Sequence, residues 1–529
     1  MIPLAVNKIN MFSKASGLTL NLRKCEILPV HHCNLKNIES IPVKNEVKYL
    51  GLIITKNGAE RENANILPRL NDVKKVFNHW LSRDLSILGR ILLSKAEGLS
   101  RLTYPCHSIF TSNKTIQTSN SIIFNFIWRN KTHYIRKSQL VKDYENGGLK
   151  ALNFESIIAA FRVTWLKECL SLSDSLWYHI PNKLFNKVGG LDFLLRCDFD
   201  LSKLPLKISP FHRQALQFGK LLFTHNFTPH NTVLWNNRVI TINRKSLFKS
   251  DWYENGVCFV LDLMQLDGHL LSYENFVSRF RIKVTCKGYE KVCKAIPTPL
   301  LRMIQNILLY SPIKTCLTSL AIDHINLLDK KCNNKWVSRT FNQLHFCNFN
   351  CDTRQDLKSS FKKKTFIFYL SYPVTPKMKE THFKIISGIY PVSDFLHKRF
   401  HFELEELCTF CSAEKETIEH LFFNCQHAMD FWTAIHGWIS LQIPNVPPFI
   451  LNDVIYYMDN LDLTISDTVN FVIVMGKFFI HTCKWRSSTP IFAVFLNYFS
   501  EYFKSLKFAC DINRKSSVLY NSIKRSLLF

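Results

Sequence analysis

Residues 408–425 read CTFCSAEKETIEHLFFNC, and four side chains in this stretch are of the kinds that bind metal ions. Cys408 and Cys411 stand two residues apart, a spacing typical of a turn that clamps one zinc ion. His420 and Cys425 follow on a segment of helical character, so the whole set reads C-x2-C-x8-H-x4-C. Because zinc is satisfied by four soft or borderline ligands in a tetrahedron, the stretch predicts one zinc ion held by these four side chains.

An alternative interpretation is that these thiols are unconnected core residues. The chain has 17 cysteines, so a CxxC pair can arise by chance. Free cysteine is among the most buried residue types and packs as a small apolar side chain. Cys25, Cys106 and Cys169 lie on or beside apolar runs, and we expect them to be buried thiols without a ligand role.

Length and composition indicate a globular chain of several domains. The sequence has 529 residues, and at roughly 150 residues per domain this predicts three or four units. Hydrophobic residues make up 47% and aromatic residues 13%, with 42 phenylalanines among them. Such a composition can bury enough apolar surface to offset the conformational entropy of the chain. We therefore expect phenylalanine to fill most of the core.

The net charge indicates a polyanionic partner. The sequence has 68 Lys and Arg residues against 41 Asp and Glu residues, which gives +27. A field of this sign attracts RNA or DNA. Phosphate contacts carry little sequence information, so we expect binding that is largely independent of base sequence and weakens steeply with salt. The sequence predicts no small-molecule substrate and leaves the oligomeric state open.

An anionic membrane surface is the rival partner, but the hydropathy pattern argues against a spanning helix. No stretch offers the roughly 18 uninterrupted apolar residues that such a helix needs, and Lys477 interrupts the most apolar run, FVIVMGKFFI. The start, MIPLAVNKINMF, lacks the basic region, apolar core and cleavage site of a secretory signal. We therefore expect a nuclear or cytoplasmic protein with reduced thiols, neither secreted nor transmembrane.

The first 60 residues predict a small α+β segment. A helix-like stretch around Ile9 to Ser16 is followed by extended runs at Leu18 to Leu22 and Glu46 to Thr55. The second run leads to Asn57 and Gly58, a pair whose tolerance of left-handed backbone suits a hairpin turn.

From residue 66 the pattern changes to a helical period. Apolar positions three or four apart predict a helix from Ile66 to Leu81 and another from about Leu85 to Leu102, which we expect to stop before Pro105. A third helix is expected from Ser112 to Trp128. Basic side chains that accompany the first two helices predict a nucleic-acid-binding helical hairpin, and the candidates are Arg83, Arg90 and Lys95.

The segment RNKTHYIRK, residues 129–137, directly follows the third helix. Its cations and the aromatic residues in and before it are Arg129, Lys131, Arg136, Lys137, Trp128, His133 and Tyr134. Cations that hold phosphates and aromatic rings on which bases stack are the usual means of binding a single strand. The cluster therefore predicts a nucleic-acid contact. The alternative is a solvated loop whose aromatic side chains pack inward.

The region from 176 to 375 has no fixed repeat, and we expect it to be mostly helical. His345, Cys347 and Cys351 lie within it, but a C-x3-C pair without a clear partner pair is a weak metal motif.

Several stretches, taken together, resemble one family, the non-LTR (LINE-type) retrotransposon reverse transcriptases, in the portion downstream of the catalytic palm motif. FSKASGLTLNLRKCEIL and VKYLGLIIT resemble the end of the palm, and WLSRDLSILGRILLSKAEGLSRLTYP resembles the thumb. FIWRN and GGLKALNF are similar to the region just beyond the thumb. KETHFKIISGIYPVSDFLHKR, leading into CTFC and EHLFFNC, resembles the zinc-binding domain that closes such polymerases.

The resemblance implies a mainly α protein with a small α+β remnant at its N-terminus, a helical thumb bundle, a helical middle and a small zinc knuckle. Lys24 occupies the position of a basic residue in the family's palm segment and is a further candidate nucleic-acid contact. The implied domains are a palm remnant, a thumb-like region, a connecting region, the zinc-binding domain and a helical tail, at 1–60, 61–175, 176–375, 376–440 and 441–529.

The residues that would catalyse polymerisation are missing from this sequence. The reaction needs paired carboxylates that hold two divalent ions, and no Y/F-x-D-D hairpin occurs in the chain. The acidic residues that do cluster lack a strand–turn–strand context and are expected to be surface groups, namely Asp198, Asp200, Asp262, Asp267, Asp453 and Asp459.

The sequence thus predicts a retroelement-derived fragment that binds RNA or DNA through basic helices and a zinc knuckle, without catalysis of its own. One alternative is that the chain is part of an active RNA-directed DNA polymerase whose catalytic region precedes Met1. Another is a relic without function or a scaffold for protein interactions.

Overall fold

The computed structural model describes residues 2–29, 31–171, 174–223, 228–308, 315–322, 325–346, 364–401, 406–459, 461–510 and 514–527. Backbone contacts group the chain into two compact units. The first unit comprises Met1–Lys74, Leu99–Asn120 and Asn153–His345, and the second comprises Lys75–Gly98, Ser121–Leu152 and Phe346–Phe529. Helices α3 (Leu67–Leu81) and α6 (Asn113–Ile127) contribute residues to both units.

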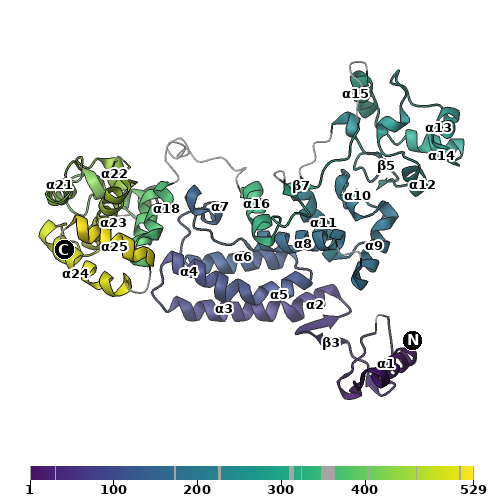
Figure 1. Cartoon of the computed structure of the whole chain (residues 1–529), viewed down its shortest axis with the longest axis horizontal. Helices are drawn as coiled ribbons and strands as arrows, with labels where there is room; N and C mark the ends of the chain where they lie inside the picture. Colours follow the sequence, from purple (N-terminus) through teal and green to yellow (C-terminus); the bar gives the residue numbers. More distant parts are fainter. Residues whose placement is uncertain are drawn as a thin grey trace. The chain divides into compact units, whose positions relative to one another are not determined.

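The described residues are mainly helical with little β-structure, which confirms the predicted fold class (Figure 1). Apart from α3 and α6, the helices of the first unit are α1 Ile2–Ser16, α2 Gly58–Asn65, α5 Ser100–Ser108, α8 Phe154–Ser171, α9 His179–Phe185, α10 Leu191–Arg196, α11 Pro210–Leu222, α12 Ser250–Glu254, α13 Tyr273–Phe280, α14 Cys286–Cys293, α15 Thr298–Leu308 and α16 Asn334–Phe346. Its strands form short antiparallel pairs, β1 Asn37–Ile38 with β2 Ile41–Pro42, β3 Glu46–Tyr49 with β4 Leu52–Thr55, β5 Thr241–Ile242 with β6 Lys245–Ser246, and β7 Ala321–Ile322 with β8 Ile325–Asn326.

The run predicted as one extended segment, Glu46 to Thr55, is itself a hairpin of β3 and β4, and the predicted turn pair Asn57 and Gly58 does not form its turn. The chain reverses at Leu50 and Gly51, whose φ angles of 46° and 79° are left-handed. Glycine adopts such angles without steric cost. Asn57 instead caps α2, because its side-chain oxygen accepts a hydrogen bond of 3.0 Å from the backbone N–H of Ala59.

Two other local predictions are wrong. The extended run expected at Leu18 to Leu22 forms no strand, because Asn21 caps a single 3-10 turn, Leu22–Lys24. The helix expected to stop before Pro105 continues through it to the end of α5. Pro105 is buried together with Leu102 and Cys106, and this packing offsets the hydrogen bond that the ring removes.

A buried arginine joins three segments of the first unit. Arg162, on α8, is fully buried, and its Nε donates to the side chain of Gln214 on α11 at 2.9 Å. Its Nη1 and Nη2 donate to the main-chain carbonyls of Cys106 and Ile109 at 3.0 and 2.7 Å. A guanidinium with all these acceptors can be buried without leaving donors unpaired.

Aromatic side chains make the core of the middle region. Trp235 and Trp252 are fully buried with ring centroids 5.9 Å apart, and Phe276 lies 4.5 Å from Trp252. Short helices joined by loops surround this cluster, rather than long helices of a bundle.

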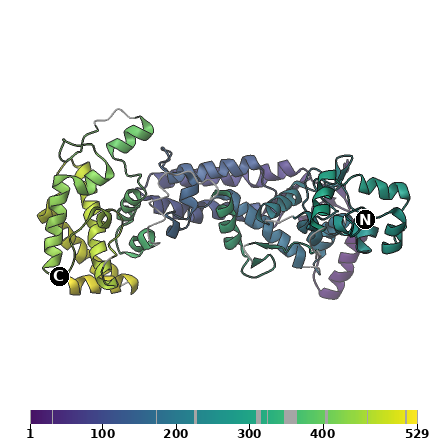
Figure 2. The ribbon, with the colours of Figure 1, turned by 90° about the horizontal axis from the view of Figure 1, so that it is seen from above.

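In the part of the second unit that the structure describes, the regular elements are helices. Apart from the shared helices, its elements are α4 Ile87–Leu93, a π-helical segment Ser94–Leu99 that runs into α5, α7 Lys137–Val141, α18 Lys364–Ser371, α19 Pro376–Ile386, α20 Ser393–Phe400, a π-helical turn His420–Asn424, α21 Gln426–Ser440, α22 Leu451–Ile455, α23 Leu463–Trp485, α24 Phe492–Cys510 and α25 Arg514–Ser526. Figures 1 and 2 show α23, α24 and α25 side by side, in agreement with their contacts.

Within this unit, the loop and helix at residues 84–93 bind to α19, nearly three hundred positions later. The backbone N–H of Ile87 donates to a side-chain oxygen of Glu380 at 2.7 Å, and Asp84 pairs with Lys377. Glu380 also pairs with Lys384 at 2.7 Å. A carboxylate at the start of a helix satisfies free N–H groups and the helix dipole, so Glu380 holds α4 on α19.

Helices α21 and α23 approach closely because a glycine faces a tryptophan. A Cβ atom on Gly476 would lie 2.6 Å from the Trp432 indole. The indole is held in place, since its Nε1 donates to the carbonyl of Phe422 at 2.8 Å. The close contact therefore connects α23 to the segment that carries His420.

The five predicted domain ranges describe family boundaries rather than contact units, and they stay predictions. Among the residues described above, none of the helices combines the length and apolar character that crossing a bilayer requires.

We expect Gly476→Ala to destabilise the second unit by about 1–2 kcal/mol, because the cost of overpacking exceeds the gain in helix propensity. The measurement is the urea midpoint of the full chain followed by tryptophan fluorescence. Gly437→Ala is the matched control on α21, since a Cβ at that exposed position would meet no atom within 4 Å. It should be neutral or slightly stabilising, and equal effects of the two variants would contradict the packing described.

Candidate metal centre

The CxxC pair lies on a tight turn within a short hairpin. Leu407 and Lys415 form an antiparallel bridge, and the N–H of Cys408 donates to the carbonyl of Glu414 at 2.7 Å. Ser412, with a φ of 53°, reverses the chain, and its N–H donates to the carbonyl of Cys408 at 2.9 Å. The hairpin therefore brings Cys408 and Cys411 to the same side of the turn.

The other two candidate ligands lie at the two ends of a π-helical turn, His420–Asn424. His420 is its first residue and Cys425 directly follows it. The Thr417 hydroxyl accepts a hydrogen bond of 3.0 Å from the His420 N–H, and the N–H of Cys425 donates to the His420 carbonyl at 2.8 Å. The wider π turn ends at Cys425, directly before α21. A π turn shifts side chains relative to an α-helix and is frequent at functional sites.

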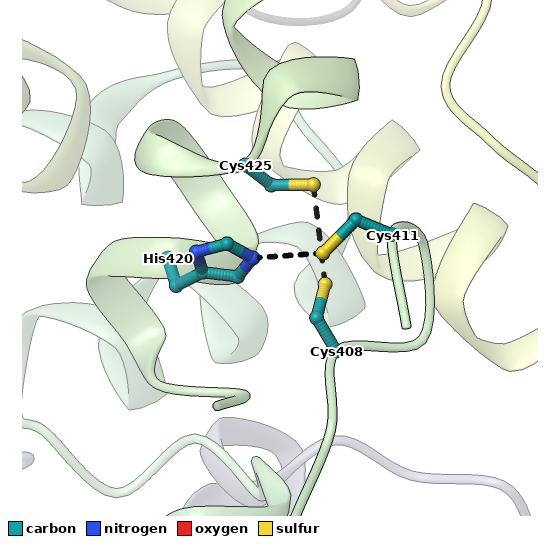
Figure 3. Close-up of side chains that lie close together, drawn as sticks. All are labelled: Cys408, Cys411, His420 and Cys425. Carbon is teal, nitrogen blue, oxygen red and sulfur yellow. Dashed lines mark hydrogen bonds between the residues drawn. The ribbon is translucent and has the colours of Figure 1, made fainter. Parts of the chain in front are cut away.

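The four side chains converge on one point, as Figure 3 shows. Their ligand atoms all lie within 4.8 Å of one another. The sulfurs of Cys408 and Cys425 are 3.9 Å apart, and the Cys411 sulfur is 3.3 Å from Nε2 of His420. The sulfur separation is far longer than the roughly 2.05 Å of a disulfide, so the thiols are not bonded to each other.

The arrangement fits a tetrahedral metal ion. With bonds of about 2.3 Å to sulfur and about 2.0 Å to nitrogen, zinc separates two sulfurs by about 3.8 Å and sulfur from nitrogen by about 3.5 Å. The two measured separations, 3.9 and 3.3 Å, are close to these values. Cys408, His420 and Cys425 are buried and Cys411 is half-buried, so the site is enclosed. Four protein ligands leave no open position for a substrate.

Backbone N–H groups favour the thiolate forms that a metal requires. Burial raises the pKa of Cys408 to about 12, although the N–H of Phe410, 3.4 Å from its sulfur, acts in the opposite direction. Burial also acts to raise the pKa of Cys411, but the N–H groups of Ala413 and Glu414 outweigh it and lower the pKa to about 6. The N–H groups thus favour the thiolate of Cys411 before any ion binds, whereas burial keeps the pKa of Cys408 and of Cys425 raised.

The second ring nitrogen of His420 also has a polar neighbour. A carboxylate oxygen of Glu414 lies 3.1 Å from Nδ1, although the two atoms are not aligned for a hydrogen bond. A metal-binding imidazole commonly donates its other N–H to a carboxylate, which fixes the ring and the tautomer. The contact is therefore consistent with Nε2 as the metal-binding atom.

Other candidate groups do not form such a cluster in the described residues, where these four side chains are the only set of three or more metal-binding types found together. Cys347 and Cys351 lie outside the described residues. Two of the acidic residues expected to be surface groups serve the fold instead: Asp198 pairs with Arg238 at 2.8 Å, and Asp262 accepts the N–H of Phe259 at 2.7 Å.

The expectation of buried thiols outside the stretch is right for Cys106 and Cys169, which are buried. Cys25 is only half-buried, because the segment around it has few buried neighbours.

The candidate nucleic-acid contacts divide between the units. Lys24 is exposed in the first unit. The others belong to the second unit, the same unit as the metal centre, and those exposed there are Arg83, Arg129, Lys131, Arg136 and Lys137. Lys95 is half-buried, and burial together with nearby Lys150 lowers its pKa.

Arg90 serves the fold rather than a ligand. Its side chain is buried, its Nε donates to the carbonyl of Ile127 at 2.6 Å, and Nη1 donates to the carbonyl of Leu85. A guanidinium whose donors face main-chain carbonyls cannot also reach a phosphate. Sequence periodicity could not separate Arg90 from exposed Arg83, because the difference depends on where α6 packs.

The aromatic side chains of the basic segment pack inward, as the alternative interpretation expected. Trp128 is 6% exposed; the His133 ring stacks on it with centroids 6.0 Å apart, and the Tyr134 ring meets it edge-on at 5.6 Å. Tyr134 also contacts Phe400 on α20, at 5.5 Å. The rings hold the segment against the helix that precedes the metal centre, and Trp128 offers no open face for a base.

Two further residues that the sequence did not single out matter for this site. Glu416 lies inside the CxxC hairpin and pairs with Lys484 at 2.6 Å. The only sequence signal for Glu416 was its position between candidate metal ligands. A charged residue in such a stretch is normally expected to be exposed to solvent.

A comparison with known families gives one match. Residues 347–432 match the family described as zinc-binding in reverse transcriptase. The match contains all four converging side chains and ends within α21. This stretch of the chain is therefore similar to the zinc-binding domain of reverse-transcriptase-related proteins, in agreement with the broader part of the resemblance. The match does not extend to the stretches that resemble palm and thumb.

We expect Arg90→Met to destabilise the second unit by about 2–4 kcal/mol, because it leaves two buried carbonyls unpaired. Arg83→Gln, which changes an exposed cation nearby, should alter stability by less than about 0.5 kcal/mol. Thermal unfolding of the two full-length variants checks this, and a Tm for Arg90→Met equal to that of the native chain would show that Arg90 is dispensable for the fold.

Proposed function

We propose that this chain is a reverse-transcriptase-related fragment that binds one structural zinc ion and holds RNA or DNA through the phosphate backbone. The observation that carries the proposal is the convergence of Cys408, Cys411, His420 and Cys425 inside the stretch that matches a zinc-binding family. Three thiolates and one imidazole form a soft, closed ligand set, which favours zinc and a structural role over catalysis.

Zinc would supply the cross-link that the small hairpin lacks. The segment from 406 to 425 has no regular structure longer than a turn, apart from its short helical end. Such a segment cannot bury enough surface to fold alone, and metal binding contributes directly to its folding free energy.

The nucleic-acid surface that we propose is the segment 129–137. Its four cations are exposed, while its aromatic side chains face the protein. Cations fixed on a rigid aromatic base suit a phosphate backbone, and the absence of an open Trp128 ring favours backbone contacts over base stacking. The excess of positive charge supports the same conclusion.

Cys408→Ser should reduce bound zinc from about one per chain to well below that level, since three remaining ligands hold the ion far more weakly. The measurement is metal analysis of the purified full-length protein, with hydrogen exchange to detect opening of residues 406–425. Cys286→Ser is the matched control, because that thiol is exposed and remote from the cluster in sequence. A native chain without zinc would refute the metal part of the proposal.

Replacing Arg129, Lys131, Arg136 and Lys137 by Gln should weaken binding to single-stranded RNA and reduce the slope of log K against log salt by about 3, at about 0.7 per phosphate contact. Filter binding across a salt series gives both quantities. The control replaces four exposed lysines of the first unit by Gln, which lowers the net charge equally: Lys183, Lys187, Lys207 and Lys335. Equal losses in the two variants would show that only the total charge matters.

A further inference from the structure

The carboxylate of Glu416 has an unusual position between the metal ligands. Its side chain is completely buried, and it lies on the hairpin strand opposite the CxxC turn. One oxygen accepts the backbone N–H of Thr409 at 3.2 Å and the hydroxyl of the same residue. Thr409 stands directly between Cys408 and Cys411, so Glu416 holds the part of the chain that carries two ligands.

The other oxygen of Glu416 binds elements outside the hairpin. It accepts the N–H of Ser393, at the start of α20, at 3.1 Å and lies 2.6 Å from Nζ of Lys484. The same ammonium donates to the carbonyl of Pro391 at 2.9 Å. One buried carboxylate thus joins the CxxC turn, the start of α20 and the end of α23.

Glu416 and Lys484 form a buried ion pair, in which each charge has a partner of opposite sign. Burial acts to raise the pKa of Glu416, but the ammonium of Lys484, which is 10% exposed, outweighs it and the pKa is lowered. The carboxylate is therefore ionised at neutral pH and each of its oxygens has donors. A buried pair of this kind costs desolvation, and removal of one partner leaves an uncompensated charge.

We infer that Glu416 and Lys484 are positioning residues of the metal centre, and that the metal-binding module extends beyond residue 432 to the end of α23. This inference rests on the proposed zinc site. The ion pair holds the CxxC turn at a fixed distance from His420 and Cys425. Residues that bond to metal ligands without binding the metal themselves commonly orient the ligands in this way. Lys484 lies outside the stretch that matches the zinc-binding family, so the inferred module is longer than that match.

The test measures the zinc affinity of the full-length chain by competition with a chromophoric chelator. Glu416→Gln and Lys484→Met should each weaken zinc binding by about tenfold or more, the usual effect of losing an outer partner. The double variant should bind zinc more tightly than Lys484→Met alone, because it no longer buries an unpaired carboxylate. Glu406→Gln is the matched control, since its pair with Lys415 lies on the same hairpin but is exposed, and it should change the affinity by less than about threefold.

A second readout separates positioning from general loss of stability. In the chain loaded with Co2+, Glu416→Gln should alter the visible absorption bands, which report the tetrahedron of ligands. Arg90→Met, which destabilises the same unit through its bonds to Ile127 and Leu85 and has no contact with the metal ligands, should leave the bands unchanged. Native affinity together with native bands in Glu416→Gln would overturn the inference while the proposed zinc site stands. A native chain that binds no zinc would refute the proposed function, and this inference with it.

Discussion

The constraint on which the second unit depends is that four ligand atoms, from a stretch of 18 residues, must meet at one point. A hairpin turn delivers two of them and a π-helical turn the other two. Neither element is stable alone, since each buries little apolar surface. Their convergence fixes the start of α21, and Trp432 on that helix then sets its distance from α23 at Gly476. The positions of the four side chains thus affect how α21 packs against α23.

The same unit connects the metal centre to the basic segment by direct contacts. Tyr134 packs on Phe400 of α20, and the start of that helix donates to Glu416 within the CxxC hairpin. A second connection runs from Asp84 to α19, because Asp84 pairs with Lys377 and lies 3.6 Å from Arg129. The segment with the proposed phosphate-binding cations is therefore connected to the metal centre by packed side chains and hydrogen bonds. On the proposed function, loss of the metal would disturb both the metal centre and this segment.

Sequence reasoning succeeded where the determining contacts are local. The convergence of the four side chains could be predicted because C-x2-C-x8-H-x4-C is a constraint within one short stretch, and α6 could be predicted from its apolar period. It failed where distant segments decide the outcome. Whether Arg90 is exposed depends on the carbonyl of Ile127, and whether Trp128 can stack on a base depends on its packing with Tyr134. The position of Glu416 between candidate ligands could not reveal its role, since its partner Lys484 is 68 positions away.

The inward packing of the aromatic residues has a consequence for recognition. A single strand bound through stacking is held by its bases, whereas one bound through cations is held by a backbone that every sequence shares. With Trp128 buried, the segment 129–137 presents mainly charge at its surface. On the proposed function, selectivity on such a surface comes from the spacing of phosphates rather than from base identity. A rigid support then matters more than extra contacts, because cations on a mobile loop would lose conformational entropy when they order on the strand. The contacts of Tyr134 with α20 provide that rigidity.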